Sequence, residues 1–176
     1  MSYFFAQNKS DFINPTNHPE RIFTPYYKTQ IFLAGPIQGA PDWQNEIGTK
    51  IVNEFESVLV TSPRAKDKPA NYEDQVSWES FYLTSSDIII FYIPDKIEDI
   101  KGRCYAQTTG FELGEWIAKA NNNESKIVII SMSDNYPLKR YVKERVKSLE
   151  KDNIKVIDFG VDSVMNCLGD IIKERG

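Results

Sequence analysis

The chain has 176 residues, of which 41% are hydrophobic and 26% are charged. These values are typical of a single globular domain with a full core and argue against a disordered chain. The net charge of −4 and the sequence pI near 5.1 argue against a groove for duplex nucleic acid, which requires clustered basic residues.

The cysteine usage and the hydropathy of the chain bear on its compartment. Cys104 and Cys167 are isolated and lack metal-ligand spacing, so we expect two free thiols in a reducing compartment. The first residues lack the basic region and long apolar run of a signal peptide. No segment approaches the ~20 apolar residues of a membrane span. A soluble, cytoplasmic protein is therefore expected.

Residues 1–29 are polar and contain three prolines and seven aromatic residues. This composition predicts an irregular N-terminal extension whose aromatic side chains dock on the domain or on a neighbouring subunit, with residues 30–176 forming one domain. His18 lies in the extension and is the only histidine. Nucleophile pairs of the Ser-His and Cys-His kinds are not expected unless His18 folds back into the site, and a His-rich metal site is not expected either.

From residue 30 onward, short apolar runs alternate with helical patterns. The apolar runs predict buried strands at residues 31–34, 58–60, 87–93, 127–130 and 154–157. The helical patterns cover residues 41–55, 73–84, 108–120, 138–149 and 161–173. This alternation predicts a five-stranded parallel sheet with helices on both faces. After Asp87, the run 87–93 is apolar on both faces, which favours the central position in the sheet.

In a fold of this kind, ligands bind at the carboxyl ends of the strands, near the point where the strand order reverses. The segments that follow the predicted strands at that edge are residues 35–39, 63–64, 94–111 and 131–136. Glu112 comes directly after the third of these segments. A lone glutamate is usually a surface residue, but its place at this edge makes Glu112 a candidate for chemistry.

The segment around Glu112 reads as the start of a helix. Thr108 or Thr109 is expected to be the N-cap, because a hydroxyl there accepts a hydrogen bond from a free backbone N–H group. Glu112 would then lie in the first turn, where the helix dipole favours its ionised form. Gly110 and Gly114 share one face, which permits close approach of a sheet or a ligand.

Other segments leave a structural and a functional interpretation open. Residues 35–39 are an ordinary strand-to-helix turn or a loop whose N–H groups meet a ligand. Glu79 and Gln75 are one helical turn apart, so their side chains share a face of the helix. This face is either exposed to solvent or part of a pocket. For Trp78 we favour a core position over a surface for base stacking. Arg64 pairs with a ligand phosphate or carboxylate, or with a surface aspartate.

Six stretches of the chain also keep the order in which they occur in a known family. They are residues 31–37 (IFLAGPI), 42–43 (DW), 62–64 (SPR), 75–79 (QVSWE), 87–94 (DIIIFYIP) and 111–116 (FELGEW). Together they resemble the nucleoside 2-deoxyribosyltransferase-like family, over about residues 30–147. The resemblance implies a flavodoxin-like or Rossmann-like three-layer sandwich. It also implies cleavage of the N-glycosidic bond of (deoxy)nucleosides or nucleotides, by transfer to another base or by hydrolysis.

The resemblance also assigns roles to residues of this chain. The nucleophilic glutamate of the family corresponds to Glu112, and the second acid, which handles the base, corresponds to Glu79. The loop of Gly35, Pro36 and Ile37 is implied to line the nucleoside pocket. The remaining residues that we expect to bind substrate are Trp43, Arg64, Trp78 and Gly110. No metal and no organic cofactor is expected, and a homo-oligomer in which a neighbour helps to close the site is implied.

Two departures from the family pattern concern the sugar. Transferases of the family often carry an aspartate six residues before the nucleophile, where it orients the sugar, and here that position is Ala106. The residues between Pro94 and Glu112 also form a longer loop than the resemblance predicts. Two alternatives therefore stay open beside an enzyme: a module that binds a nucleotide or nucleotide signal without turnover, and an oligomeric scaffold with a vestigial site.

Overall fold

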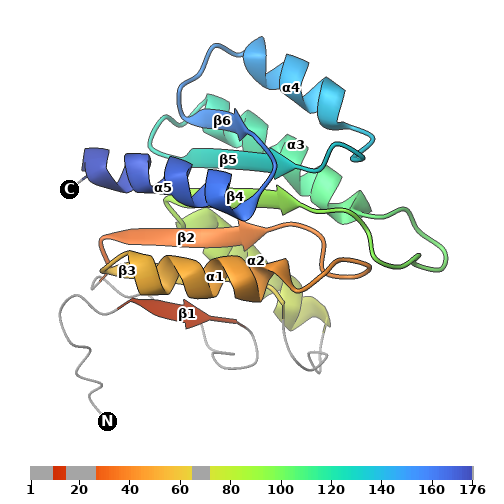
Figure 1. Cartoon of the computed structure of the whole chain (residues 1–176), viewed down its shortest axis with the longest axis horizontal. Helices are drawn as coiled ribbons and strands as arrows, with labels where there is room; N and C mark the ends of the chain where they lie inside the picture. Colours follow the sequence, from red (N-terminus) through yellow and green to blue (C-terminus); the bar gives the residue numbers. More distant parts are fainter. Residues whose placement is uncertain (1–9, 15–26, 65–71, 176) are drawn as a thin grey trace.

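A computed structural model describes residues 10–14, 27–64 and 72–175 of the chain. In these ranges six parallel strands and five helices alternate (Figure 1). The strands are β1 (Asp11–Ile13), β2 (Thr29–Ala34), β3 (Val58–Thr61), β4 (Ile88–Ile93), β5 (Ile127–Met132) and β6 (Ile154–Ile157). The helices are α1 (Trp43–Glu54), α2 (Tyr72–Ser85), α3 (Gln107–Asn121), α4 (Lys139–Lys147) and α5 (Val161–Arg175).

The strands form one sheet in the order β1-β3-β2-β4-β5-β6. From β2 the chain continues outward to β3 and then crosses back to β4 on the other side of β2, so the strand order reverses between β2 and β4. All six residues of β4 are buried, which confirms its predicted central position. The carboxyl ends of β2 and β4 therefore flank the point at which doubly wound folds bind ligands.

The sheet has six strands, and the prediction of five was wrong by one. The additional strand β1 lies within the segment 1–29 that was expected to be irregular, and it pairs with β3 through Asp11 and Leu59, Phe12 and Val60, and Ile13 and Thr61. It has only three residues, and only Ile13 is fully buried. An edge strand this short shows too little alternation to be detected as a period-2 pattern.

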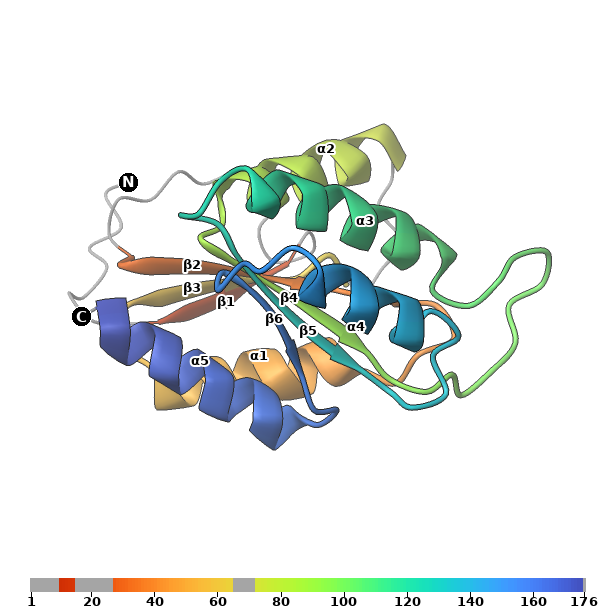
Figure 2. The same cartoon turned by 90° about the horizontal axis from the view of Figure 1, so that it is seen from above.

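The helices cover both faces of the sheet and produce a three-layer sandwich (Figure 2). Helices α2, α3 and α4 pack on one face, against Ile89, Phe91 and Ile93 of β4. Helices α1 and α5 pack on the other face, against Ile88 and Ile90 of the same strand. Successive residues of a strand point to opposite faces, so a strand covered on both sides must be apolar throughout. No helix in the described ranges is both long and apolar enough to span a membrane.

Lys126 is a buried cation at the end of the sheet away from the site. Its ammonium group donates hydrogen bonds to the main-chain carbonyl oxygens of Leu83 at 3.3 Å and Thr84 at 3.0 Å, and also to that of Ser86. It lies 5.3 Å from the ring centroid of Trp116. Burial lowers the pKa of Lys126 to about 8. The side chain therefore provides donors for carbonyl groups at the C-terminal end of α2, which have no partners within the helix.

We expect Lys126→Met to lower the free energy of unfolding by about 1–3 kcal/mol, because it leaves these buried carbonyl oxygens without a donor. Urea unfolding followed by circular dichroism measures this change. Lys151→Met is the matched control, since Lys151 pairs with Glu124 at 2.9 Å on the surface and contributes about 0–1 kcal/mol. Equal stabilities of the two variants would contradict the structural role of Lys126.

Candidate active site

A cavity of about 370 Å³ opens at the carboxyl ends of β2 and β3, between α2 and the start of α3. This volume lies within the range of small-molecule sites. Its wall contains side chains from β2, the loop after β2, α2, the loop before α3 and the first turns of α3. The described residues of the wall that matter below are Gly35, Pro36, Ile37, Gln38, Gln75, Glu79, Arg103, Ala106, Gln107, Thr108, Thr109 and Glu112.

Two half-buried carboxylates, Glu79 of α2 and Glu112 of α3, share this cavity. Burial, and to a smaller extent the charges of Glu79 and Glu115, raise the pKa of Glu112 to about 7. Burial also raises the pKa of Glu79, while a hydrogen bond of 2.7 Å from the Gln75 amide to Glu79 Oε1 lowers it. The two carboxyl groups are close enough to interact electrostatically, so the pair holds a proton more readily than either group alone.

The start of α3 differs from the prediction and explains the state of Glu112. The N-cap is Ala106, in the left-handed conformation with φ of 56°, and no side chain caps the helix. The helix begins at Gln107, so the expected caps Thr108 and Thr109 are already inside it. Glu112 consequently lies in the second turn, where the helix dipole has little effect. The expected effect of the dipole is therefore outweighed by burial, and the pKa of Glu112 is raised.

The loop after β2 forms one wall of the cavity and includes Gly35, Pro36 and Ile37, the residues to which the resemblance assigns the nucleoside pocket. Gly35 has φ of 151°, and a Cβ atom there would lie 2.3 Å from the carbonyl oxygen of Tyr92 and 2.7 Å from the Trp43 ring. Only glycine fits this position. Trp43 supports the loop from behind, where its Nε1 donates a hydrogen bond of 2.9 Å to the Pro36 carbonyl oxygen.

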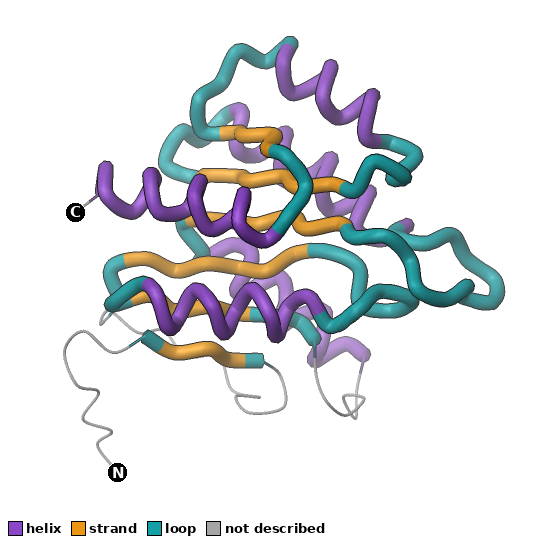
Figure 3. The backbone as a smooth tube through the Cα atoms, in the orientation of Figure 1, coloured by secondary structure: helices purple, strands orange, loops and turns teal. Residues whose placement is uncertain are grey.

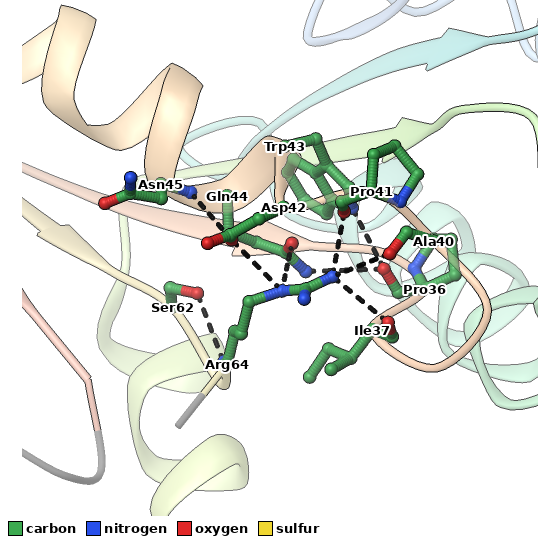
Figure 4. Close-up of polar contacts among 10 residues, drawn as sticks. All are labelled: Pro36, Ile37, Ala40, Pro41, Asp42, Trp43, Gln44, Asn45, Ser62 and Arg64. Atoms are coloured by element: carbon green, nitrogen blue, oxygen red, sulfur yellow. Dashed lines mark hydrogen bonds and ion pairs between the residues drawn. The ribbon is translucent and has the colours of Figure 1, made fainter. Parts of the chain in front are cut away.

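Arg64 anchors the same loop (Figure 4). Its Nη2 donates hydrogen bonds to the carbonyl oxygens of Ile37 at 3.0 Å and Pro41 at 2.8 Å, and its Nε donates to Gln44 Oε1 at 2.8 Å. Asp42 Oδ1 lies 3.3 Å from Nε. The guanidinium group thus joins the end of β3 to the turn that precedes α1. Arg64 positions the cavity wall from outside the cavity.

We expect Arg64→Met to lower the free energy of unfolding by about 2–3 kcal/mol, because hydrogen bonds from a charged group contribute about 1.5–3 kcal/mol each and several are lost together. Arg64→Lys should lie between this variant and the wild type, since it keeps the charge but not the planar fork. Chemical unfolding measures the free energy of unfolding of both variants. Lys50→Met removes an exposed pair with Asp162 at 3.3 Å and serves as the control. A loss no larger than that of the control would contradict the anchoring role.

Four residues expected to bind substrate are absent from the described part of the cavity wall: Trp43, Arg64, Trp78 and Gly110. Trp78 is 3% exposed and packs on Tyr82 in the core, with ring centroids 4.3 Å apart. Gly110 faces away from the cavity, since a Cβ atom there would lie 3.4 Å from the Tyr136 hydroxyl. Trp78 thus lies in the core, Gly110 faces Tyr136, and Trp43 and Arg64 support the loop after β2.

Five residues of the cavity wall were not predicted as site residues from the sequence. They are Gln38, Tyr72 and three residues of the loop between β4 and α3, namely Ile100, Arg103 and Cys104. This loop projects beyond the carboxyl edge of the sheet (Figure 3). It has no periodic pattern, and only its place after the central strand pointed to the site. His18 lies outside the described residues. In the described ranges, no group of three or more His, Cys, Asp or Glu side chains is placed to hold a metal ion.

The sequence model for the family described as nucleoside 2-deoxyribosyltransferase like matches residues 28–131, which contain β2 to β4, α3 and both cavity carboxylates. A search of curated protein sequences finds no significant match. Because the family match covers more than half of the chain, the chain belongs to the nucleoside 2-deoxyribosyltransferase-like family.

Proposed function

We propose that this protein cleaves the N-glycosidic bond of a (deoxy)nucleoside or nucleotide, with Glu112 as the nucleophile and Glu79 as the acid. The observation that carries the proposal is the pair itself: two half-buried carboxylates from separate helices share one small-molecule cavity and have raised pKa values. Family membership supports the reaction type. Paired carboxylates are also the groups that glycosidic bond cleavage uses elsewhere.

The first step breaks the bond between C1′ and the base nitrogen. The electron pair of that bond stays on the base, which takes a proton from Glu79. One oxygen of Glu112 stabilises the oxocarbenium-like transition state and then bonds to C1′. This step requires Glu79 to be protonated and Glu112 to be ionised. When the pair holds one proton, the reactive form is the one in which that proton is on Glu79.

The second step releases the sugar from Glu112. In hydrolysis, a water oxygen attacks C1′, the bond between C1′ and the Glu112 oxygen breaks, and the water proton returns to Glu79. In transfer, the nitrogen of a second base attacks instead and gives its proton to Glu79. Ala106 brings an apolar side chain into the cavity, at the family position where an aspartate often orients the sugar. We infer that this site holds the sugar by other contacts.

A substrate panel tests the proposal. Purified protein is incubated with ribo- and deoxyribonucleosides and with their 5′-monophosphates, each with and without an acceptor base, and free base is measured by chromatography. Release of base alone supports hydrolysis, and formation of a new nucleoside or nucleotide only with acceptor supports transfer. If no base is released from any member of the panel, the proposed function is wrong.

Ala106 also favours a second candidate, a module that binds a nucleotide without turning it over. Submicromolar binding by calorimetry, with no product after prolonged incubation, would decide for this candidate. In both cases we infer a homo-oligomer, as family membership implies. The exposed side chains of Tyr72 beside the cavity and of Phe111 and Tyr141 on α3 and α4 support this inference. Sedimentation that shows a monomer at micromolar concentration would contradict it.

A further inference from the structure

Arg103 is the one positively charged side chain among the described residues of the cavity wall. It is exposed and donates a hydrogen bond to Gln38 Oε1. It forms no ion pair with any carboxylate in the described ranges, Glu79 and Glu112 included. A guanidinium group has five N–H donors, so most of them remain available to a ligand.

The cavity wall carries charges of both signs on different elements: the carboxyl groups of Glu79 and Glu112 on α2 and α3, and the guanidinium group of Arg103 on the loop before α3. Glu79 and Glu112 interact with each other, and the pKa of Glu112 is raised by burial and by neighbouring carboxylates. Arg103 is bound instead to the loop after β2, through Gln38. A ligand that fills the cavity therefore meets carboxyl groups in one region and a guanidinium group in another.

The first turn of α3 adds further donors to the cavity. Gln107, Thr108 and Thr109 line the wall, and the helix has no side-chain cap. The first N–H groups of a helix have no partners within it, and the helix dipole favours an anion there. The guanidinium group, the Gln38 amide and these N–H groups thus offer several donors to one anionic group. Planar guanidinium groups match phosphate oxygens particularly well.

We propose that Arg103, Gln38 and the first turn of α3 bind the 5′-phosphate of a nucleoside monophosphate. This inference rests on the proposed function and specifies its substrate class. In a nucleotide, the base is attached at C1′ and the phosphate is carried on C5′, across the sugar ring. The scissile bond then lies at Glu79 and Glu112 while the phosphate lies at Arg103. The guanidinium charge offsets the repulsion between the phosphate and the two carboxylates.

The test compares kcat/KM for three forms of each substrate: the unphosphorylated nucleoside, its 5′-monophosphate and its 3′-monophosphate. We expect the wild type to prefer the 5′-monophosphate at least ~10-fold. Arg103→Met should reduce this preference by ~10- to 100-fold, mainly through KM, because charge-assisted hydrogen bonds to the phosphate are lost. The preference of Arg103→Lys for the 5′-monophosphate should lie between those of the wild type and Arg103→Met. Lys101→Met is the matched control, since Lys101 is an exposed cation of the same loop outside the cavity wall.

Equal preference for nucleoside and 5′-monophosphate in the wild type would overturn the inference, and so would an equal effect of Arg103→Met on both. Equal use of the 3′-monophosphate would also contradict it. If no substrate releases base, the proposed function fails, but calorimetry with the same nucleotides still decides on Arg103. Weaker binding of 5′-monophosphates to Arg103→Met then supports the phosphate site, and unchanged binding, or none to either protein, overturns it.

Discussion

Glu112→Gln is expected to reduce base release by at least ~10⁴-fold, because loss of the nucleophile costs up to ~10⁶-fold in other covalent enzymes. The glutamine side chain has nearly the same shape, so the cavity should keep its form. The measurement is single-turnover release of base from the best substrate of the panel, followed by chromatography. Glu144→Gln removes an exposed carboxylate on α4 and should retain wild-type activity.

The same variant should gain stability while it loses activity. The folded-state pKa of Glu112, about 7, is above the ordinary value of 4.5 for a glutamate, so the folded protein binds the proton more tightly than the unfolded chain. The protonated carboxyl group therefore contributes to the stability of the fold at low pH, and this contribution is lost as the pH rises through 7. We expect Glu112→Gln at pH 8 to be more stable than the wild type by up to ~3 kcal/mol, since one pKa unit corresponds to about 1.36 kcal/mol.

The stability measurement separates loss of chemistry from loss of structure. Thermal unfolding at pH 8 and at pH 4 should show a difference between Glu112→Gln and the wild type that shrinks at the lower pH. Base release by Glu112→Gln at the wild-type rate would show that Glu112 is not the nucleophile. An inactive variant with reduced stability at pH 8 would instead mean that Glu112 supports the fold.

Glu79→Gln is expected to reduce base release by ~10²- to 10⁴-fold, the usual contribution of general acid catalysis. It should also change the pH dependence. With both carboxyl groups present, the active form holds one proton, so kcat/KM of the wild type should fall as the pH rises above about 7 and fall again at low pH. Without Glu79, the active form needs only an ionised Glu112. The fall above pH 7 should disappear.

The remaining titration in Glu79→Gln should also move. The charge of Glu79 contributes to the raised pKa of Glu112, so its removal should leave a single titration, that of Glu112, at a pH below 7. A substrate with a leaving group that needs no proton, such as a 4-nitrophenyl glycoside of the same sugar, should restore much of the rate of Glu79→Gln but not that of Glu112→Gln. Rescue of both variants, or of Glu112→Gln alone, would contradict the assignment of roles.

Much of the architecture follows from local patterns in the sequence. The apolar runs of β2 and β4 and the helical periods around them predict a parallel sheet covered on both faces, because burial on two sides requires an apolar strand. The rule for ligands at strand carboxyl ends then selected the loop after β2 and the start of α3. Strand β1 was not predicted, since three residues at a sheet edge carry little periodic signal.

The sequence by itself determined the fold class and family and brought Glu112 and Glu79 forward as a pair, because these depend on periodic burial and on ordered motifs. Only the tertiary structure decided which side chains line the cavity. Four residues of the sequence motifs lie outside the described cavity wall: the side chains of Trp43, Arg64 and Trp78 face the core or the back of the loop after β2, and Gly110 faces Tyr136. Conversely, Arg103 comes from a loop without pattern, and Glu112 has a pKa near 7 because folding buries it beside Glu79. Both depend on contacts between segments far apart in the chain.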